Sequence, residues 1–100
     1  MLNITIKGTN IKLTDELRGY VLERFGVLDR FFEHADPDTV SADVEVGKPS
    51  GHHRKGQVFR CEINLRVGGV LLRAADGGET IYEAIDRVRD RTLSEVRKLK

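Results

Sequence analysis

Three cations in the last quarter of the chain have a spacing that could bind a polyanion. Arg87, Arg91 and Lys98 are separated by four and seven residues, which places them within about 40° of one another on a helix with 100° per residue. Guanidinium and ammonium groups in such a line can pair with phosphates. The row alone favours an ordinary solvated helix face over a polyanion-binding surface, so other features of the chain must decide between the two.

A second group of cations lies in the longest irregular segment of the chain. Arg54 and Lys55 follow His52 and His53 in a stretch whose two glycines and one proline predict a loop. Adjacent histidines suggest a metal site, but such a site needs three or four convergent donors, and Cys61 points into the core by its strand parity. We expect no metal here. The histidines are exposed loop residues or contact a phosphate backbone.

Motifs for catalysis are absent from the sequence. It contains no phosphate-binding glycine signature, no nucleophile elbow and no histidine, carboxylate and serine set on elements that would converge. The pairs Gly68-Gly69 and Gly77-Gly78 have the composition of turns. Cys61 lacks an activating base or cation on its face of the strand, which predicts a buried apolar residue rather than a nucleophile. We expect no enzyme activity, no cofactor and no small-molecule substrate.

The composition restricts the class of protein and its compartment. One hundred residues, 39% hydrophobic and 33% charged, predict one soluble globular domain, 1–100. The sequence has no apolar run long enough to cross a bilayer and no signal segment. Its single cysteine fits a reducing compartment. We therefore expect a cytoplasmic protein that does not contact a membrane.

The net charge of +1 hides a division along the chain. Residues 1–47 carry five basic and nine acidic side chains, whereas residues 48–100 carry twelve basic and seven acidic ones. Such local positive charge argues against a histone-like coat. It permits a patch that touches a nucleic acid in one orientation.

Hydrophobic periodicity predicts the elements that must position these side chains. Apolar and polar residues alternate, with the period of a strand, in 2–7, 40–46, 59–67 and the segment that follows residue 69. Helical spacing follows the capping residue Thr14 as far as Glu33 or His34, and it recurs over 81–100.

The resulting order, β-α-β-β-β-α, predicts a single-domain α+β fold. We expect a four-stranded, mainly antiparallel sheet with both helices packed on its apolar face and the other face open to water. This architecture is similar to that of a double-stranded-RNA-binding domain. Gly68-Gly69 should form a two-residue hairpin turn, because two glycines accept the positive φ angles that such turns need. The turn pairs Leu65 with Leu72 and Ile63 with Ala74.

The aromatic residues mostly fall on the predicted core faces. They are Tyr20, Phe25, Phe31, Phe32, Phe59 and Tyr82. Recognition of unpaired bases by stacking is therefore a weaker interpretation than binding to the phosphates and shape of a folded RNA.

Four short strings occur in a fixed order along the chain. They are Asn3-Ile4-Thr5-Ile6 with Gly8-x-Asn10, Leu13-Thr14-x-x-Leu17-Arg18-x-Tyr20-Val21, Leu28-x-Arg30-Phe31-Phe32, and Ile81-Tyr82-x-Ala84-Ile85-Asp86. With the same element order, they resemble the ribosome hibernation promoting factors, a family of sigma-54 modulation protein and ribosome-associated inhibitor type. The likeness is to the N-terminal ribosome-binding domain of that family and covers essentially all 100 residues.

The resemblance implies a cytosolic protein without catalytic activity that binds the 30S ribosomal subunit between head and body. There it would contact 16S ribosomal RNA, occupy the space of messenger and transfer RNA, and hold the ribosome inactive under stress or in stationary phase. Many relatives also carry a second small domain that dimerises ribosomes. Whether this protein has such a C-terminal dimerisation domain, or a separate ribosome-dimerising partner, stays open.

Family members contact RNA mainly through basic residues of the two helices. By position, Arg91 and Lys98 fall where the family tends to have lysine, and Arg18 and Arg24 match basic positions on the first helix. Ser94 stands where relatives often place arginine, which leaves the depth of that contact open. With the row and the loop included, the candidate RNA-binding residues are Arg18, Arg24, Arg54, Lys55, Arg87, Arg91 and Lys98.

Two other classes of function stay open. A generic double-stranded RNA-binding domain would share charge and shape, but it would bind free duplex RNA as well as it binds ribosomes. A protein-interaction module would use the open sheet face, where Arg60, Arg66 and Arg73 lie beside acidic residues. The mixed charge there favours solvent.

Overall fold

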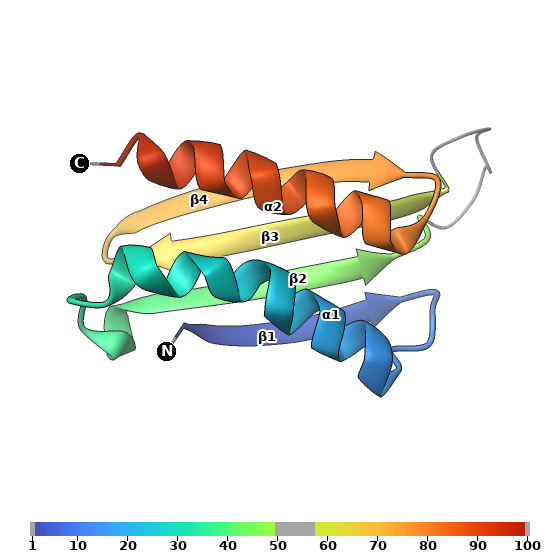
Figure 1. Cartoon of the computed structure of the whole chain (residues 1–100), viewed down its shortest axis with the longest axis horizontal. Helices are drawn as coiled ribbons and strands as arrows, with labels where there is room; N and C mark the ends of the chain where they lie inside the picture. Colours follow the sequence, from blue (N-terminus) through green and yellow to red (C-terminus); the bar gives the residue numbers. More distant parts are fainter. Residues whose placement is uncertain (1, 50–57, 100) are drawn as a thin grey trace.

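The computed structural model describes residues 2–49 and 58–99, and its elements follow the predicted order (Figure 1). The elements are β1 (Asn3–Thr9), α1 (Asp15–Phe25), η1 (Gly26–Phe32), η2 (Pro37–Thr39), β2 (Val40–Gly47), β3 (Phe59–Val67), β4 (Val70–Gly78) and α2 (Ile81–Arg97). The two η segments are short 3-10 helices. The predicted α+β class and the β-α-β-β-β-α order are confirmed.

The four strands form one sheet in the order β1-β2-β3-β4. β1 pairs with β2 in parallel, and the other two pairings are antiparallel. A parallel pair needs a long crossover connection, which α1 and the two 3-10 segments supply. The predicted register is confirmed, since Leu65 pairs with Leu72 and Ile63 with Ala74.

Both helices pack on the same face of the sheet. Figure 1 shows α1 and α2 side by side, running in the same direction and lying roughly along the strands. The buried cluster between helices and sheet consists of Leu17, Val21, Phe25, Leu28, Ala42, Val44, Val46, Cys61, Ile63, Leu65, Ala84, Ile85, Val88 and Val96. The opposite face of the sheet is open, as predicted. No helix within the described residues is long and apolar enough to span a bilayer.

The first predicted helix extends less far as an α-helix than its apolar spacing indicated. α1 ends at Phe25, and the chain continues as the 3-10 segment η1. Phe25 and Leu28 are both fully buried, and a 3-10 turn places residues three apart on one side. Gly26, a weak helix former, stands at the change. The second helix ends at Arg97 rather than at residue 100.

The two glycine pairs behave differently from the prediction. In the hairpin turn only Gly68 has a positive φ, of 60°, which matches a turn with one left-handed central residue rather than two. Gly77 and Gly78 do not follow the fourth strand but belong to it, because they pair with Arg60 and Phe59 of β3. Strand β4 therefore reaches the start of α2.

Gly78 also allows the sheet and α2 to approach closely. A Cβ atom at this position would lie 2.8 Å from the backbone nitrogen of Ala84, in the first turn of α2. Carbon atoms that are not bonded to a neighbour do not come so near, so only glycine fits this corner without a shift. The end of β4 and the first turn of α2 are thus held against each other.

Candidate nucleic-acid interface on the helix layer

The helix α2 is oriented by a capping residue and an apolar stripe. Thr80 caps it, with its side-chain oxygen accepting a hydrogen bond from the Glu83 backbone N–H at 3.1 Å. The predicted apolar stripe is buried in its centre, at Ile85, Val88, Thr92 and Val96. The Thr92 hydroxyl donates to the Val88 carbonyl at 2.7 Å, which satisfies the only buried polar side chain of that stripe. The opposite side of α2 is left to charged residues.

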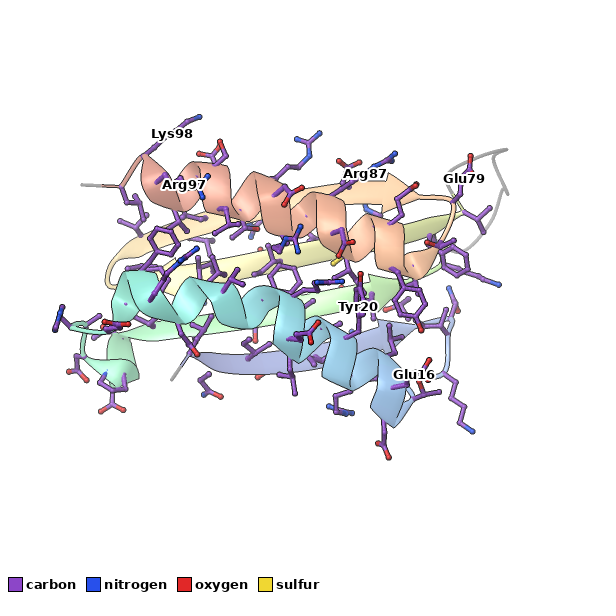
Figure 2. The ribbon with its side chains drawn as sticks, in the orientation of Figure 1. Glu16, Tyr20, Glu79, Arg87, Arg97 and Lys98 are labelled. Carbon is purple, nitrogen blue, oxygen red and sulfur yellow. The ribbon has the colours of Figure 1, made fainter. Side chains whose placement is uncertain are left out.

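Two arginines of the predicted row bind to the end of strand β4. Arg87 Nη1 donates to the Gly77 carbonyl at 2.9 Å, and its Nη2 lies 3.4 Å from Glu83 Oε1. Arg91 Nε donates to Asp76 Oδ2 at 2.9 Å. These contacts exist because β4 continues past Asp76 and passes beside the first half of α2. Figure 2 shows Arg87 on the side of α2 that is farther from α1.

The three cations of the row face solvent, but they are not free of partners. The side chains of Arg87, Arg91 and Lys98 are 44%, 62% and 71% exposed, so the row is accessible. Each member, however, has an acidic neighbour, since Lys98 Nζ lies 3.9 Å from Glu95 Oε2. A phosphate that approaches this row meets paired cations.

The carboxylate of Asp76 is stabilised in its charged form. The hydrogen bond from Arg91 holds the pKa of Asp76 below its ordinary value, and a second one from the Gly77 backbone N–H at 2.8 Å acts in the same direction. Partial burial opposes this shift and is weaker. Asp76 therefore stays ionised, and the Arg91 pair persists, at neutral pH.

On α1, one predicted cation is open and the other is enclosed. Thr14 caps the helix by accepting from the Leu17 backbone N–H at 3.1 Å, as predicted. Arg18 is exposed, and it forms no salt bridge with any residue that the structure describes. Arg24 lies in the contact between the helices, where its Nε is 3.2 Å from Asp86 Oδ1.

A cluster of polar and aromatic residues joins α1 to α2 around Arg24. The Tyr20 hydroxyl donates to Asp86 Oδ1 at 2.8 Å, and the Arg24 guanidinium stands 4.6 Å from the centre of the Tyr20 ring. Tyr82 meets the Tyr20 ring edge-on at 4.7 Å, and its hydroxyl donates to Glu16 at 3.3 Å. Desolvation, and then the Glu16 carboxylate, raise the pKa of the Tyr82 hydroxyl. We call these five residues the inter-helix cluster.

The predicted site residues thus lie at separate places on the helix layer. Arg24 lies between the helices, whereas Arg87 and Arg91 lie near the end of β4 and Lys98 extends from the end of α2 (Figure 2). Arg54 and Lys55, together with His52 and His53, lie outside the described residues. Residues 2–49 and 58–99 contain no group of three or more side chains that could hold a metal ion.

The helices are close to neutral, which the candidate cations alone did not reveal. α1 carries three acidic and two basic residues, and α2 carries four of each. Two cations of α2 were missed, Arg89 and Arg97, because neither lies on the predicted row. Arg89 donates to Asp90 through Nε at 3.1 Å and through Nη2 at 3.0 Å. Counting both charge signs along the helix would have found this balance.

Four of the six aromatic side chains are at least partly buried, and two are exposed. Phe25 is buried, and Tyr20, Phe32 and Phe59 are partly buried, but Phe31 and Tyr82 are each 37% exposed. The Arg30 guanidinium stands 5.7 Å from the centre of the Phe31 ring. The two exposed rings do not form a row on which bases could stack, because the Tyr82 ring already packs against the Tyr20 ring.

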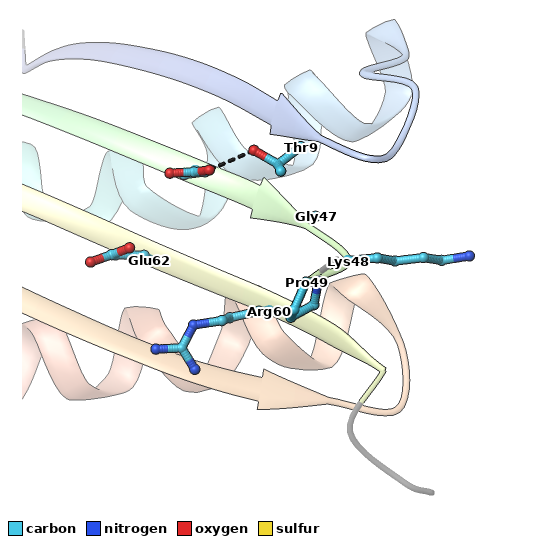
Figure 3. A pocket seen from close by; sticks show the side chains of 7 residues that line it. Thr9, Gly47, Lys48, Pro49, Arg60 and Glu62 are labelled. Atoms are coloured by element: carbon cyan, nitrogen blue, oxygen red, sulfur yellow. Dashed lines mark hydrogen bonds between the residues drawn. The ribbon is translucent and has the colours of Figure 1, made fainter. Parts of the chain in front are cut away.

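The open sheet face carries the other accessible arginines. Arg60, Arg66 and Arg73 are exposed there and form no salt bridge within the described part of the chain. At one end of this face a hollow of about 160 Å³ is lined by Thr9, Glu45, Gly47, Lys48, Pro49, Arg60 and Glu62 (Figure 3). The Thr9 hydroxyl donates to Glu45 across it. Its mixed charges show no preference for an anion or a cation.

Cys61 has the predicted position on the helix-facing side of the sheet. Its side chain is fully buried and makes no disulfide. Burial raises the pKa of its thiol to about 12, so the nucleophilic thiolate is scarce at neutral pH. The residue packs in the core.

Comparison with known proteins places this geometry in a family. Residues 4–100 match the model of the sigma 54 modulation protein / S30EA ribosomal protein family. The chain is 30% identical over 100 residues to a ribosome hibernation promotion factor of Lactococcus lactis and 31% identical over 100 residues to one of Staphylococcus aureus. These alignments cover all of this chain but 50% and 49% of the relatives. The chain spans about half the length of the curated relatives it matches.

Solved structures show the same fold. The N-terminal domain of Protein Y from Thermus thermophilus superposes with a TM-score of 0.78 at 29% identity, covering 98% of this chain and 99% of that one. A ribosomal subunit interface protein from Coxiella burnetii gives a TM-score of 0.73 at 13% identity, over 98% and 96% of the two chains, and supports the fold alone. The chain belongs to the sigma 54 modulation protein / S30EA ribosomal protein family.

Proposed function

We propose that this domain is the ribosome-binding part of a hibernation factor. It binds the 30S subunit through the helix layer, contacts 16S ribosomal RNA in the decoding channel, and excludes messenger and transfer RNA. The observation that carries the proposal is the match over the whole chain to relatives named ribosome hibernation promotion factor. The cations of α1 and α2 supply groups that can reach phosphates.

The chemistry of the proposed interface is binding without a covalent step. Folded RNA offers dense phosphate and a shallow minor groove, which rigid helices can contact through shape and paired charges. Arg18 presents a cation without a salt bridge among the described residues, and Lys98 is only loosely paired with Glu95. Arg24, Arg87 and Arg91 present guanidinium groups that acidic neighbours already orient. Affinity then depends on how well the RNA matches these fixed donors as well as on charge.

Competition with transfer RNA tests the proposal. Two ligands that exclude each other must each weaken the apparent affinity of the other. In cosedimentation with purified 30S subunits, excess initiator transfer RNA with messenger should therefore displace the protein. In a translation assay, inhibition should reach its limit near one protein per ribosome, because the protein occupies a site and does not turn over.

The sheet face supports a second candidate interface. Its arginines Arg60, Arg66 and Arg73 are exposed and form no salt bridge among the described residues. A protein that bound free duplex RNA as tightly as 30S subunits, and that ignored transfer RNA, would be a generic RNA-binding domain, and this face would then be the first surface to examine.

A further inference from the structure

Asp76 holds one arginine of the proposed interface from the strand side. Its Oδ1 accepts from the Gly77 backbone N–H at 2.8 Å, and its Oδ2 accepts from Arg91 Nε at 2.9 Å. The side chain of Asp76 is 22% exposed and that of Arg91 is 62% exposed. The carboxylate is therefore fixed to the backbone of β4, while most of the Arg91 side chain stays accessible to solvent.

This contact leaves part of the guanidinium available. A guanidinium has five N–H donors in a rigid plane, and Asp76 engages the one on Nε. The four donors on the two terminal nitrogens have no hydrogen-bond partner among residues 2–49 and 58–99. Because Nε is held, the plane of the guanidinium has a set direction, and a phosphate can still bind two terminal donors at once.

The ion pair that Arg91 forms with Asp76 has no net charge. Attraction to an RNA whose phosphates have no fixed position relative to the protein depends on net charge and on the counterions released. A neutral pair contributes little to that attraction. Binding to a surface that places a phosphate at the free donors is favoured instead by a guanidinium that is already ordered.

We propose that Asp76 is a specificity-determining residue of this interface, which weakens attachment to RNA in general and orients Arg91 for one placed phosphate. The proposal rests on the proposed function and deepens it. It assigns to an acidic residue of β4 a role in recognising a polyanion. A domain that must find ribosomes among other RNA needs interactions that disfavour the wrong partner, and a carboxylate beside a cation is such an interaction.

The Arg89 and Asp90 pair offers a matched control on the same helix. Asp90 engages two donors of Arg89, and its side chain is 68% exposed. Replacing Asp90 with asparagine removes the same charge and also one ion pair. It leaves Asp76 and Arg91 unchanged, so it reports the effect of losing one negative charge and one surface ion pair elsewhere on the helix.

The experiment compares the intact chain with Asp76→Asn and Asp90→Asn in binding to purified 30S subunits and to a free RNA duplex, at the same salt concentration. For Asp76→Asn we expect tighter duplex binding, by about threefold, from one uncovered cation. We expect 30S binding to stay equal or weaken, so that the ratio of the two affinities falls. Asp90→Asn should change both affinities by the same factor.

Other results would overturn the proposal. A ratio that is unchanged in Asp76→Asn, or that falls equally in Asp90→Asn, means that Asp76 has no special role. Thermal unfolding shows whether each variant is folded. Asp76→Glu serves as a second variant, because it keeps the charge but moves the carboxylate. It should bind the duplex as weakly as the unchanged chain does. Failure of the unchanged chain to prefer 30S over duplex would instead contradict the proposed function.

Discussion

The helix layer and the open sheet face carry arginines in very different surroundings. Every salt bridge among the described residues involves a cation of α1 or of the α2 segment that ends at Lys98. Arg60, Arg66 and Arg73 on the sheet face take part in none. The surface that the family likeness favours for RNA is thus the one whose charges are internally matched. A count of cations in the sequence says little about how they are presented.

The difference follows from the geometry of the two surfaces. On a helix, residues four apart are neighbours, which brings Glu83 to Arg87. On the sheet face, the cross-strand neighbours of the arginines are not acidic. Arg66 stands opposite Ser41 and Leu71. Two acids of this face meet each other instead, since Glu45 lies directly opposite Glu62, an arrangement of like charges that is unfavourable.

Reversing the charge of the row on α2 should produce the largest effect. We expect Arg87→Glu, Arg91→Glu and Lys98→Glu together to weaken 30S binding roughly a hundredfold and to flatten its dependence on salt, by about 0.7 to 0.9 log units for each phosphate that is no longer neutralised. Cosedimentation over a salt series measures both quantities. The matched control is the triple reversal of Arg60, Arg66 and Arg73.

The control decides which surface binds. A small effect of the sheet-face reversal would keep the interface on the helices. If the sheet-face variant lost binding equally and remained folded by circular dichroism, the binding site would move to the sheet, and unpaired charge would be a better guide than the family likeness.

A smaller effect is expected from the inter-helix cluster. Tyr20→Phe removes the hydroxyl that donates to Asp86 but keeps the ring beneath Arg24. We expect 30S binding to weaken about threefold, because Asp86, the partner of Arg24, is then held by one hydrogen bond fewer. In a chain that already carries Arg24→Ala, the same change should have no further effect on binding.

Tyr82→Phe is the matched control for this cycle. It removes a longer hydrogen bond, to Glu16, and leaves Asp86 and Arg24 alone. Additive losses of affinity from Tyr20→Phe and Arg24→Ala would show that Tyr20 does not act through Arg24, and the cluster would then only hold the helices together.

The smallest expected effect is on how the free energy of unfolding depends on pH. The pKa of Asp76 is lowered in the folded chain, so its pairing stabilises the fold at pH values above the ordinary aspartate pKa, near 3.9. That contribution is lost as pH falls through the lowered folded value. We expect Asp76→Asn to cost about 1 kcal/mol or less at neutral pH and nothing once the carboxyl is protonated in both the folded and the unfolded chain.

Urea unfolding across this pH range measures the difference. Asp43→Asn provides the sheet-face counterpart, because Asp43 is exposed and has no salt bridge in the described part of the chain. At neutral pH it should cost less stability than Asp76→Asn, because it removes no ion pair among the described residues. An equal loss of stability in both variants would remove the contrast between the two surfaces.

Much of the fold could be predicted from the sequence because it depends on local patterns. Alternation identified the strands, and the hairpin register followed from the short turn between Leu65 and Leu72. The end of α1 was placed too late, since apolar spacing cannot distinguish an α-helix from a following 3-10 segment. The inclusion of Gly77 in β4 depends on pairing with Arg60, a contact between distant residues.

The candidate site was harder to predict for the same reason. Helical spacing correctly left Arg87, Arg91 and Lys98 out of the buried stripe. Their partners come from β4 and from intervening acids, so the spacing of cations alone did not indicate Asp76. Tyr20 and Asp86 stood in the strings that carry the family resemblance, which was the available signal for the inter-helix cluster.

The close approach at Gly78 fixes where α2 starts on the sheet. A Cβ atom at this glycine would lie 2.8 Å from the backbone nitrogen of Ala84. The buried side chains of the helix, as far as Val96, then hold the rest of α2 against the same sheet. A larger residue at position 78 would push the first turn away from β4, and with it Arg87 and Arg91, whose partners lie on that strand. The presentation of these two cations therefore depends on a residue that has no side chain.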